Sequence, residues 1–313
     1  MAKILVTGAF GQIGSELTLA LMAKYGKDNV VAMGHSNIPT GFDGIVEQAE
    51  ITDLEALKRI ITKYQITDVY HLVSILSAKG EENPDLTWSV NMGGLKNILD
   101  LAREYKLKVF WPSTIAAFGP NTPKDAPQDT IMQPTTMYGV TKVAGEQLAH
   151  YYFSKYGVDI RSVRYPGIIS WKTPPGGGTS DYAVAIFYDG IKTGKYECFV
   201  GPQTMIPMMY VDDAISATVQ IMEAPADKIK IRTSYNLAAI SFTAEELATE
   251  INKHIKVEVT YKPDYRQAIA DSWPQRLLDS PARADWGWSH QIDLAKMVEI
   301  MILNLQKKIT KQE

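Results

Sequence analysis

Residues 4–14 read ILVTGAFGQIG, and this stretch decides the fold. Its first letters belong to an apolar run over residues 3–7, which predicts a short buried strand. A helix is predicted from about Ile13 to Tyr25, with Gly26 placed to end it. A strand that passes into a helix after so short a turn begins a strand–helix–strand unit.

Three glycines occupy that turn at a spacing of three, namely Gly8, Gly11 and Gly14. Glycine lets the chain turn tightly, lets the backbone approach a pyrophosphate, and lets the helix pack close to the sheet. The pyrophosphate would lie at the helix N-terminus, whose free N–H groups favour an anion. The position and the flanking elements predict a dinucleotide site rather than a glycine-rich turn without a ligand.

The alternation of strand and helix continues to about residue 165. Strands are predicted at residues 30–33, 68–73, 108–112 and 159–165, and helices at about 53–64, 84–105 and 138–155. The pattern predicts an α/β fold, a Rossmann-type doubly wound parallel sheet with helices on both faces. Ligands of such sheets bind at the carboxyl ends of the strands, and Gly8, Ser74 and Thr114 would all lie there.

The regular alternation ends after residue 170, where residues 173–178 read as a flexible loop. We therefore expect a dinucleotide-binding domain at residues 1–170 and a smaller α/β region at residues 171–313 that binds and covers the substrate. An alternative returns residues of about 205–240 to the first domain. In the loop, Gly176–Gly178 would expose backbone N–H groups to a small carboxylate, or would act only as a hinge before a helix.

The composition narrows the class of protein. The chain has 313 residues, of which 45% are hydrophobic and 21% charged, as in an ordinary globular protein. A net charge of −3 offers no basic surface to nucleic acid or to an anionic membrane. No apolar run reaches the ~18 residues that a membrane span needs, and the start of the chain enters a strand rather than a signal peptide. We expect a cytoplasmic protein that binds neither nucleic acid nor membrane.

Cysteine and histidine give no sign of a metal. The single cysteine, Cys198, cannot form an internal disulfide, which fits a reducing compartment. It is predicted to be a small buried hydrophobe. The five histidines are scattered without the spacing of metal ligands, so no metal site is predicted.

A second stretch, residues 113–142, carries acid–base chemistry. It begins with STIAAFGP at the end of a predicted strand and ends with Tyr138 and Lys142, four positions apart on a predicted helix. Residues at this spacing share a helix face at about 5–6 Å between Cβ atoms, and the ammonium would lower the cost of ionising the phenol. A hydroxyl of Thr114 or Ser113 could hold a substrate oxygen against it. Together these groups predict a general base for an alcohol whose carbon loses a hydride.

The end of the second predicted strand bears on the choice of dinucleotide. It reads Gly34, His35, Ser36 and Asn37, without the Asp or Glu that bonds the adenosine ribose in NAD sites. A carboxylate would repel a 2′-phosphate, so its absence removes a barrier to NADP. The three polar residues could donate hydrogen bonds to that phosphate, although no Arg or Lys stands there. NAD and NADP both stay open.

These motifs resemble the extended short-chain dehydrogenase/reductase superfamily, which includes UDP-galactose 4-epimerase. The likeness is closer to its L-threonine 3-dehydrogenase type and covers nearly the whole chain. It is carried by LVTGAFGQIG (5–14), HLVSILSAKGE (71–81), STIAAFGP (113–120), RYPGIIS (164–170), GGGTSDYA (176–183), PMMYVDDA (207–214) and SWPQRLLDSPARADWGW (272–288). The last four segments are specific to this enzyme type.

The resemblance implies oxidation of the L-threonine 3-hydroxyl to L-2-amino-3-oxobutyrate, with NAD accepting hydride. It implies that Tyr138 is the base, that Lys142 lowers its pKa and holds the nicotinamide ribose, and that Thr114 orients the substrate hydroxyl. The implied substrate contacts are Ser77, Ser113, Thr114, Tyr138, Gly178, Thr179 and Trp273. The implied cofactor contacts are Gly8, Gly11, Gln12, Ile13, Gly14, His35, Ser36, Glu50, Ile51, Leu72, Val73, Ser74, Asn91, Tyr138, Lys142, Tyr165, Pro166 and Ile168.

The chain departs from the family pattern at two cofactor positions. Gly34 and Glu50 both stand where relatives commonly carry Asp, and the first departure keeps NADP possible. The superfamily also implies a homodimer through the helices at residues 84–105 and 138–155. Two other functions remain open, a nucleotide-sugar epimerase or dehydratase of the same superfamily and a non-enzymatic dinucleotide sensor. The sensor is disfavoured because Tyr138 and Lys142 are both present.

Overall fold

The computed structural model describes residues 2–36 and 38–310, which form two compact units. Unit 1 consists of Met1–Ala117, Pro134–Arg164 and Ile215–Tyr235, and unit 2 of Phe118–Gln133, Tyr165–Ala214 and Asn236–Glu313. The predicted boundary between two domains at residue 170 stays a prediction. Asn37, a predicted phosphate donor, lies outside the described residues.

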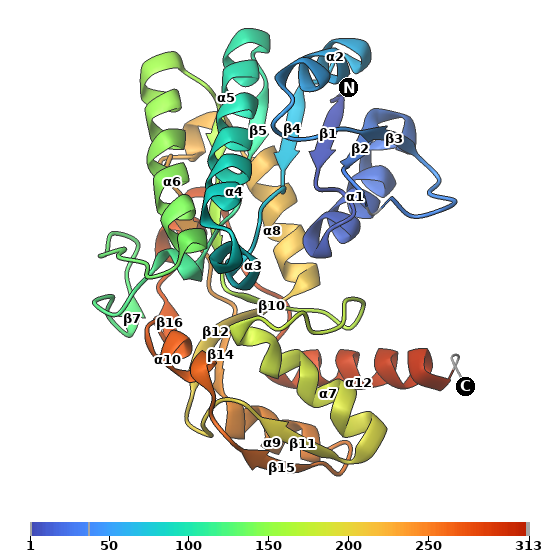
Figure 1. Ribbon diagram of the computed structural model, residues 1–313, viewed down its shortest axis with the longest axis vertical. Helices are drawn as coiled ribbons and strands as arrows, with labels where there is room; N and C mark the ends of the chain where they lie inside the picture. The colour runs from blue at the N-terminus through green and yellow to red at the C-terminus, as the bar shows by residue number, and fades with distance from the viewer. Residues whose placement is uncertain (1, 37, 311–313) are drawn as a thin grey trace. The chain divides into compact units, whose positions relative to one another are not determined.

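The elements follow the chain in the order that Figure 1 labels. Up to residue 161 they are β1 (Ile4–Thr7), α1 (Gln12–Tyr25), η1 (Lys27–Asn29), β2 (Val30–Gly34), β3 (Ile45–Gln48), α2 (Leu54–Tyr64), β4 (Asp68–His71), α3 (Ser77–Glu82), α4 (Pro84–Trp88), η2 (Ser89–Gly93), α5 (Gly94–Tyr105), β5 (Lys108–Phe110), β6 (Ser113–Thr114), η3 (Ile115–Ala117), β7 (Asp125–Ala126), α6 (Met137–Tyr156) and β8 (Ile160–Arg161). Beyond it they are β9 (Val163–Tyr165), β10 (Gly167–Ile169), η4 (Thr179–Asp181), α7 (Tyr182–Thr193), β11 (Lys195–Cys198), β12 (Met205–Tyr210), α8 (Val211–Glu223), η5 (Ala226–Lys228), β13 (Tyr235–Asn236), β14 (Ile240–Thr243), α9 (Ala244–Asn252), β15 (Glu258–Tyr261), α10 (Tyr265–Asp271), β16 (Arg276–Leu277), α11 (Ser280–Trp286) and α12 (Leu294–Thr310).

The main sheet of unit 1 has the strand order β3-β2-β1-β4-β5-β8, and its neighbouring strands run parallel (Figure 1). The chain starts in the middle at β1, extends to β3 at one edge, and then returns to build β4, β5 and β8 toward the other. Because crossovers between parallel strands are right-handed, α1 lies on one face and α2, α5 and α6 on the other. The predicted Rossmann-type doubly wound sheet is confirmed.

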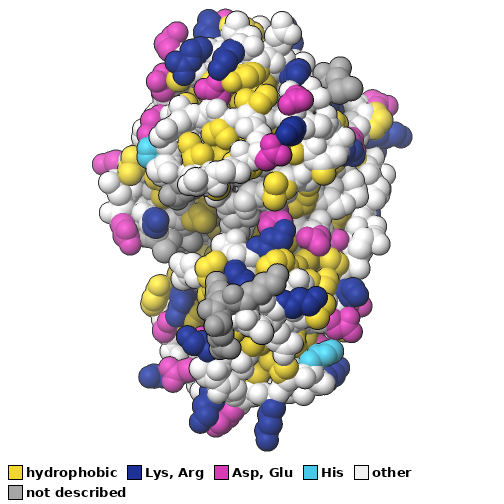
Figure 2. All heavy atoms as spheres, turned by 90° about the vertical axis from the view of Figure 1, so that its right-hand side faces the viewer, with side chains coloured by type: hydrophobic (Ala, Val, Ile, Leu, Met, Phe, Trp, Pro, Cys, Tyr) yellow, Lys and Arg dark blue, Asp and Glu magenta, His cyan; other side chains and the backbone are white. Residues whose placement is uncertain are grey.

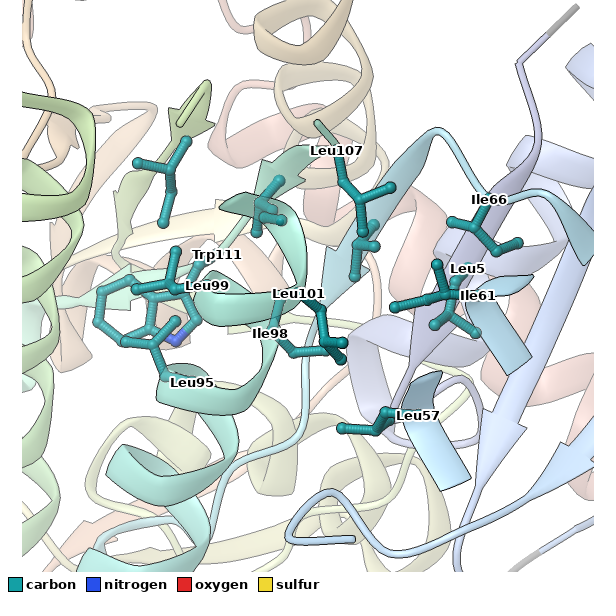
Figure 3. Close-up of a cluster of buried hydrophobic side chains, with 14 of the residues drawn as sticks. Leu5, Leu57, Ile61, Ile66, Leu95, Ile98, Leu99, Leu101, Leu107 and Trp111 are labelled. Atoms are coloured by element: carbon teal, nitrogen blue, oxygen red, sulfur yellow. The ribbon is translucent and has the colours of Figure 1, made fainter. Parts of the chain in front are cut away.

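One hydrophobic cluster fills the space between this sheet and α2, α5 and α6 (Figure 3). The strands contribute alternate residues, because successive side chains of a strand point to opposite faces. The cluster is drawn in Figure 3 with Leu5, Leu57, Ile61, Ile66, Leu95, Ile98, Leu99, Leu101, Leu107 and Trp111 labelled. Asp53 caps α2 by accepting a hydrogen bond from the Ala56 N–H at 3.0 Å.

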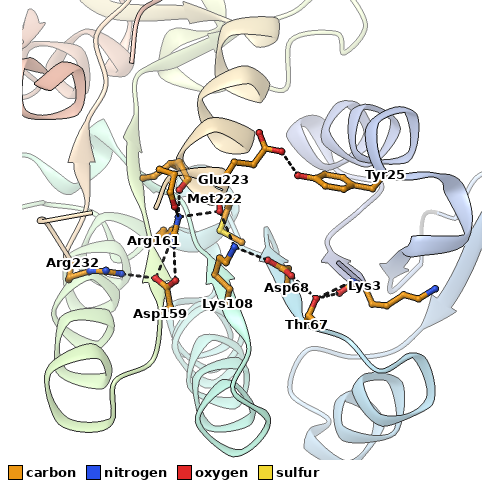
Figure 4. Close-up of polar contacts among 12 residues, drawn as sticks. Lys3, Tyr25, Thr67, Asp68, Lys108, Asp159, Arg161, Met222, Glu223 and Arg232 are labelled. Carbon is orange, nitrogen blue, oxygen red and sulfur yellow. Dashed lines mark hydrogen bonds and ion pairs between the residues drawn. The ribbon is translucent and has the colours of Figure 1, made fainter. Parts of the chain in front are cut away.

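A network of ion pairs around two buried arginines lies at the amino ends of the strands in unit 1 (Figure 4). The Asp159 carboxylate accepts from Arg161 at 2.8 Å and from Arg232 at 2.7 Å. Arg161 also donates to the carbonyls of Ile221 and Ala224, both at 2.6 Å, at the carboxyl end of α8. Helix ends leave such carbonyls without partners, so the guanidinium satisfies groups that the helix cannot.

Unit 2 is a smaller α/β arrangement with short sheets. Among its described residues the strand orders are β10-β12-β14, β11-β15 and β16-β7, and β12 pairs antiparallel with β14. Trp288 anchors the unit, since its buried indole N–H donates to the Asp279 carboxylate at 2.9 Å. Cys198 is buried on β11, where burial raises the pKa of its thiol, so its predicted role as a small hydrophobe fits.

The surface carries charges of both signs. On the face drawn in Figure 2, Lys and Arg side chains are interspersed with Asp and Glu rather than gathered by sign. Among the described residues, no helix combines the length and the apolar character that crossing a membrane requires.

Replacing Asp159 by Asn tests the buried network. Both guanidinium groups are nearly buried, with 2% and 6% of the Arg161 and Arg232 side chains exposed. We expect the variant to lose about 3 kcal/mol of unfolding free energy in urea titrations, because it leaves buried charges without a counter-charge. Glu223→Gln, which removes the exposed partner of Lys24, is the control and should cost about 0–1 kcal/mol.

The loss should also depend on pH. Although burial acts to raise it, the two arginines hold the pKa of Asp159 below its usual range. The stabilisation is therefore present above the usual carboxyl range and disappears as pH falls through the lowered pKa. Equal losses in both variants, or a loss that persists at acid pH, would contradict the role of Asp159.

Candidate active site

The glycine turn of unit 1 has the shape that an anion requires. Gly8 has a φ of +71°, in the left-handed region, and a Cβ on Gly14 would lie 2.0 Å from the Gly8 carbonyl oxygen. The helix α1 starts at Gln12, no side chain caps it at Gly11, and its first turn holds no acidic residue. The N–H groups at its start thus remain available for a negative charge, and the turn fits a pyrophosphate.

The carboxyl ends of β2 and β3 lie side by side, and a carboxylate is present there. Glu50 follows β3, and its Oε1 lies 2.5 Å from Nε2 of His35. The family resemblance implies Glu50 as a cofactor contact, but its pairing with His35 could not be predicted, because Glu50 is remote from the end of β2 along the chain. A Cβ on Gly34 would lie 2.5 Å from a ring carbon of Phe10, so an aspartate at this position would displace the ring.

The loop after β4 is held in place by Asn91. This residue lies in η2, a single π-helical turn, and is 5% exposed. Its Oδ1 accepts from the Ile75 N–H at 2.8 Å, and its Nδ2 donates to the Ile75 carbonyl and to the Thr141 hydroxyl, both at 3.1 Å. The amide therefore fixes the loop that carries residues 72–74 and joins it to α6. Ser77 follows at the start of α3 and is partly buried.

The catalytic candidates meet where α6 begins. The Thr136 hydroxyl caps α6 by accepting from the Gly139 N–H at 3.1 Å. A Cβ on Gly139 would lie 2.2 Å from the Ala116 carbonyl oxygen, so α6 touches η3, which directly follows Thr114. This approach lets the Thr114 hydroxyl donate a hydrogen bond to the phenol of Tyr138.

Lys142 lies one turn further along α6 in an apolar niche. Its Nζ donates to the Pro112 carbonyl at 2.7 Å and lies 4.6 Å from the Trp111 ring centroid and 5.5 Å from that of Tyr138. The structure thus brings Thr114, Tyr138 and Lys142 together. It also places Gly8, Ser74 and Thr114 after β1, β4 and β5, which are adjacent strands.

Burial dominates the ionisation of these two groups. Burial raises the pKa of Tyr138 to about 12, and the hydrogen bond from Thr114 acts against the rise. Burial lowers the pKa of Lys142 to about 7, and the charge of Glu146 acts in the opposite direction. Burial leaves the phenol less acidic than usual in the protein by itself, and the predicted effect of Lys142 on its pKa stays a prediction. The first proton that these two neighbouring groups lose therefore leaves near pH 7.

A carboxylate beside this pair was missed from the sequence. Glu146 lies one further turn along α6, is fully buried, and accepts from the Ser113 hydroxyl at 2.6 Å and from Arg164 at 2.7 Å. The spacing Tyr138, Lys142, Glu146 repeats every four residues, and that repeat could have indicated a third residue on the same helix face. Ser113 is buried with its proton donated to Glu146, and its predicted contact with substrate stays a prediction.

The remaining predicted residues belong to unit 2. Tyr165, Pro166 and Ile168 lie on or between β9 and β10, and Trp273 follows α10. Thr179 is nearly buried at the start of η4. Their contacts with cofactor or substrate stay predictions.

The glycine-rich loop differs from its prediction. The N–H groups of Gly176 and Gly178 donate to Oδ2 of Asp181 at 2.7 and 2.8 Å. The expectation that they stand free is therefore wrong in this structure, because a carboxylate of the chain itself accepts from both.

Comparison with known proteins assigns the chain to a family. The model of the NAD dependent epimerase/dehydratase family matches residues 4–238. An uncharacterized epimerase/dehydratase of Staphylococcus haemolyticus is 47% identical over 98% of this chain and 99% of its own length. The mitochondrial L-threonine 3-dehydrogenase of Bos taurus is 47% identical over 96% of this chain and 82% of its own. A monomeric L-threonine 3-dehydrogenase from a metagenome, in its apo form, superposes with a TM-score of 0.94 at 50% identity, over 97% and 99% of the two chains.

Replacing Gly139 by Ala tests whether the close approach of α6 sets the site. The added methyl would meet the Ala116 carbonyl, which belongs to the backbone and cannot swing aside as a flexible side chain would. We expect a loss of about 1–3 kcal/mol in unfolding free energy. The catalytic rate should fall by about 10²-fold, since small displacements of reacting groups have effects of that size.

Gly93→Ala is the matched control, because nothing lies within 4 Å of a Cβ at that helical position. Denaturation curves and steady-state rates should therefore be close to those of the parent protein. Unchanged activity in Gly139→Ala would contradict the argument from close packing.

Proposed function

The chain belongs to the NAD dependent epimerase/dehydratase family, and from this we propose that it oxidises the 3-hydroxyl of L-threonine to L-2-amino-3-oxobutyrate, with hydride transfer to a nicotinamide cofactor. The observation that carries the proposal is the hydrogen bond between Thr114 and the buried phenol of Tyr138, with Lys142 one turn away. The likeness to L-threonine 3-dehydrogenases over nearly the whole chain supports the substrate.

Each residue of the site has a role in this reaction. Tyr138 accepts the proton of the substrate hydroxyl as the phenolate, and Thr114 holds the hydroxyl oxygen in line with it. Lys142 stabilises that phenolate with its ammonium charge, which the apolar niche leaves poorly screened by solvent. When bound, the nicotinamide accepts the hydride that leaves C3 of the substrate. No metal is needed to polarise the alcohol, because the phenolate removes its proton.

We propose NAD as the physiological cofactor. The support is the Glu50 carboxylate at the ends of β2 and β3, which would repel a 2′-phosphate and could accept hydrogen bonds from the adenosine. Gly8, Gly11 and Gly14 would hold the pyrophosphate, and Lys142 the nicotinamide ribose. The other cofactor contacts proposed are Gln12, Ile13, His35, Ser36, Ile51, Leu72, Val73, Ser74, Asn91, Tyr165, Pro166 and Ile168.

The amino acid would be held by residues that the resemblance implies. Ser77, Ser113, Gly178, Thr179 and Trp273 are proposed as its contacts. Asp181 now accepts from the N–H groups of Gly176 and Gly178, so a substrate carboxylate that used them would have to displace it.

A nucleotide-sugar epimerase or dehydratase is the second candidate. This candidate is favoured by the family's name, NAD dependent epimerase/dehydratase. The Staphylococcus haemolyticus relative is also named an epimerase/dehydratase. Such an enzyme would bind UDP-sugars, whereas the proposed dehydrogenase would not.

The assembly and location of the protein are proposals as well. We propose a homodimer through α4 and α6, because Leu86, Trp88, Val140 and Tyr151 leave large apolar side chains exposed there. One similar L-threonine 3-dehydrogenase is described as monomeric. We also propose a cytoplasmic location, since a single cysteine fits a reducing compartment. A part in threonine breakdown follows from the proposed reaction.

Initial rates of nicotinamide reduction with L-threonine test the function. We expect turnover with NAD to exceed turnover with NADP, because of Glu50. Tyr138→Phe should lose at least about 10²-fold in kcat, since general base catalysis contributes 10²–10⁴-fold, while cofactor affinity is retained. Retained turnover in Tyr138→Phe would remove the phenol from its role, and activity on UDP-sugars alone would favour the second candidate.

The wild-type rate should rise with pH. The reactive form has one proton on the Tyr138–Lys142 pair, located on the lysine, and the pair reaches this state as pH passes about 7. The positive charge of oxidised nicotinamide would lower that value further. We therefore expect kcat/KM at saturating cofactor to climb to a plateau with a midpoint at about pH 7 or below. A rate that falls as pH rises from about 6 to 8 would contradict this assignment.

A further inference from the structure

We propose that Glu146, locked by Arg164 and Ser113, is a positioning residue for the reaction, one that aligns Thr114 and favours the ammonium form of Lys142. The inference rests on the proposed function, because part of its test measures the turnover of L-threonine. It adds to that function a group that touches neither substrate nor cofactor.

The Glu146 carboxylate accepts three hydrogen bonds. Its Oε1 accepts from the Ser113 hydroxyl at 2.6 Å and from Arg164 Nε at 2.9 Å, and its Oε2 accepts from Arg164 Nη2 at 2.7 Å. The pair is bidentate and almost without solvent, since the two side chains are 0% and 3% exposed. Charge-assisted bonds of this geometry are strong and directional. The carboxylate therefore has one position, and it imposes that position on Ser113.

Ser113 transmits this position to the catalytic hydroxyl. Ser113 and Thr114 form the two-residue strand β6, and adjacent strand residues point to opposite faces. The side chain of Ser113 is thus tied to Glu146 while Thr114 faces the phenol of Tyr138. Backbone pairing with β9 also holds β6, so loss of the bond to Ser113 would relax the strand rather than release it, and Thr114 would shift slightly with it.

Glu146 also provides a negative charge one helix turn from Lys142. On α6 itself, Lys142 is faced by Tyr138 on one side and Glu146 on the other. The residue after β5 contributes the Trp111 ring, and Pro112 contributes its carbonyl. His71 at the end of β4 is buried and neutral, because burial and then the charge of Lys142 lower its pKa to about 3. The Glu146 carboxylate is thus the charge that favours the ammonium form of Lys142.

A displacement of Thr114 and a lower pKa of Lys142 would change the pH profile of the rate in different ways. In the Tyr138–Lys142 pair, the plateau rate follows the fraction of molecules with the proton on Lys142 rather than on Tyr138. If the pKa of Lys142 falls, the midpoint moves to lower pH and the plateau falls with it, by about tenfold for each pH unit. A displacement of Thr114 alone lowers the plateau and leaves the midpoint in place.

The test uses two variants of the full chain. Glu146→Gln combined with Arg164→Met removes both charges, so no buried charge is left alone. We expect its plateau in kcat to fall by about 10²-fold and its midpoint to move to lower pH. Ser113→Ala removes one hydrogen bond and keeps the charge, so its kcat should fall by about tenfold with an unchanged midpoint. The dissociation constant for NAD should change little in both.

Asp159→Asn is the matched control, because it disrupts the other buried network of unit 1 far from Lys142. It should leave the midpoint and the plateau unchanged at a temperature where it stays folded. A lower plateau with a fixed midpoint in the double variant would show a structural role only and overturn the proposal. Unchanged kcat in Ser113→Ala would overturn it too, even if the double variant did not fold.

A second readout separates this inference from the proposed function. Lys142 lies over the Trp111 ring, so its ionisation should change the fluorescence of that indole. The difference in tryptophan fluorescence between the parent protein and Lys142→Met should show a transition near pH 7, without any substrate. In the Glu146→Gln/Arg164→Met background this transition should move to lower pH. A transition that does not move would overturn the inference whether or not L-threonine is oxidised.

Discussion

The close packing of α6 against the backbone that follows β5 governs the site. A Cβ at Gly139 would lie 2.2 Å from the Ala116 carbonyl, and one at Gly145 would lie 2.4 Å from the ring of Trp111. Two glycines thus let the helix approach the strand ends closely over more than one turn. Tyr138 and Lys142 lie between or beside these contacts. They are consequently buried against Thr114 and Trp111 rather than exposed on a helix surface.

Burial has a cost that the chain offsets with charge. A buried phenol resists ionisation and a buried amine resists protonation, yet the reaction needs the phenolate and the ammonium together. The structure supplies a hydroxyl from Thr114 to the phenol and a carboxylate from Glu146 near the amine. Glu146 in turn would be unfavourable without Arg164, which neutralises it bidentately. The network behind the site is therefore as important to its chemistry as the residues that face the substrate.

Much of this arrangement could be predicted from the sequence, because it depends on short motifs whose residues are close together along the chain. The glycine spacing, Asp53 at a helix start, and Tyr138 four residues before Lys142 depend only on neighbours along the chain. The strand β3 was missed, since its four residues are short and half-exposed at a sheet edge. Three contacts were also missed, namely Glu50 with His35, Asp181 with the glycine-rich loop, and Arg164 with Glu146. Such partners depend on tertiary packing, and no periodicity of the sequence reveals them.

The central claim is that hydride leaves C3 of L-threonine while Tyr138 takes the hydroxyl proton. The most direct measurement uses L-threonine labelled with deuterium at C3, with the reduced nicotinamide analysed for the label. The account predicts that the deuterium appears at C4 of the nicotinamide ring, and that Tyr138→Phe abolishes its transfer. Reduced cofactor without the label, or no reduction in protein that binds NAD, would contradict it.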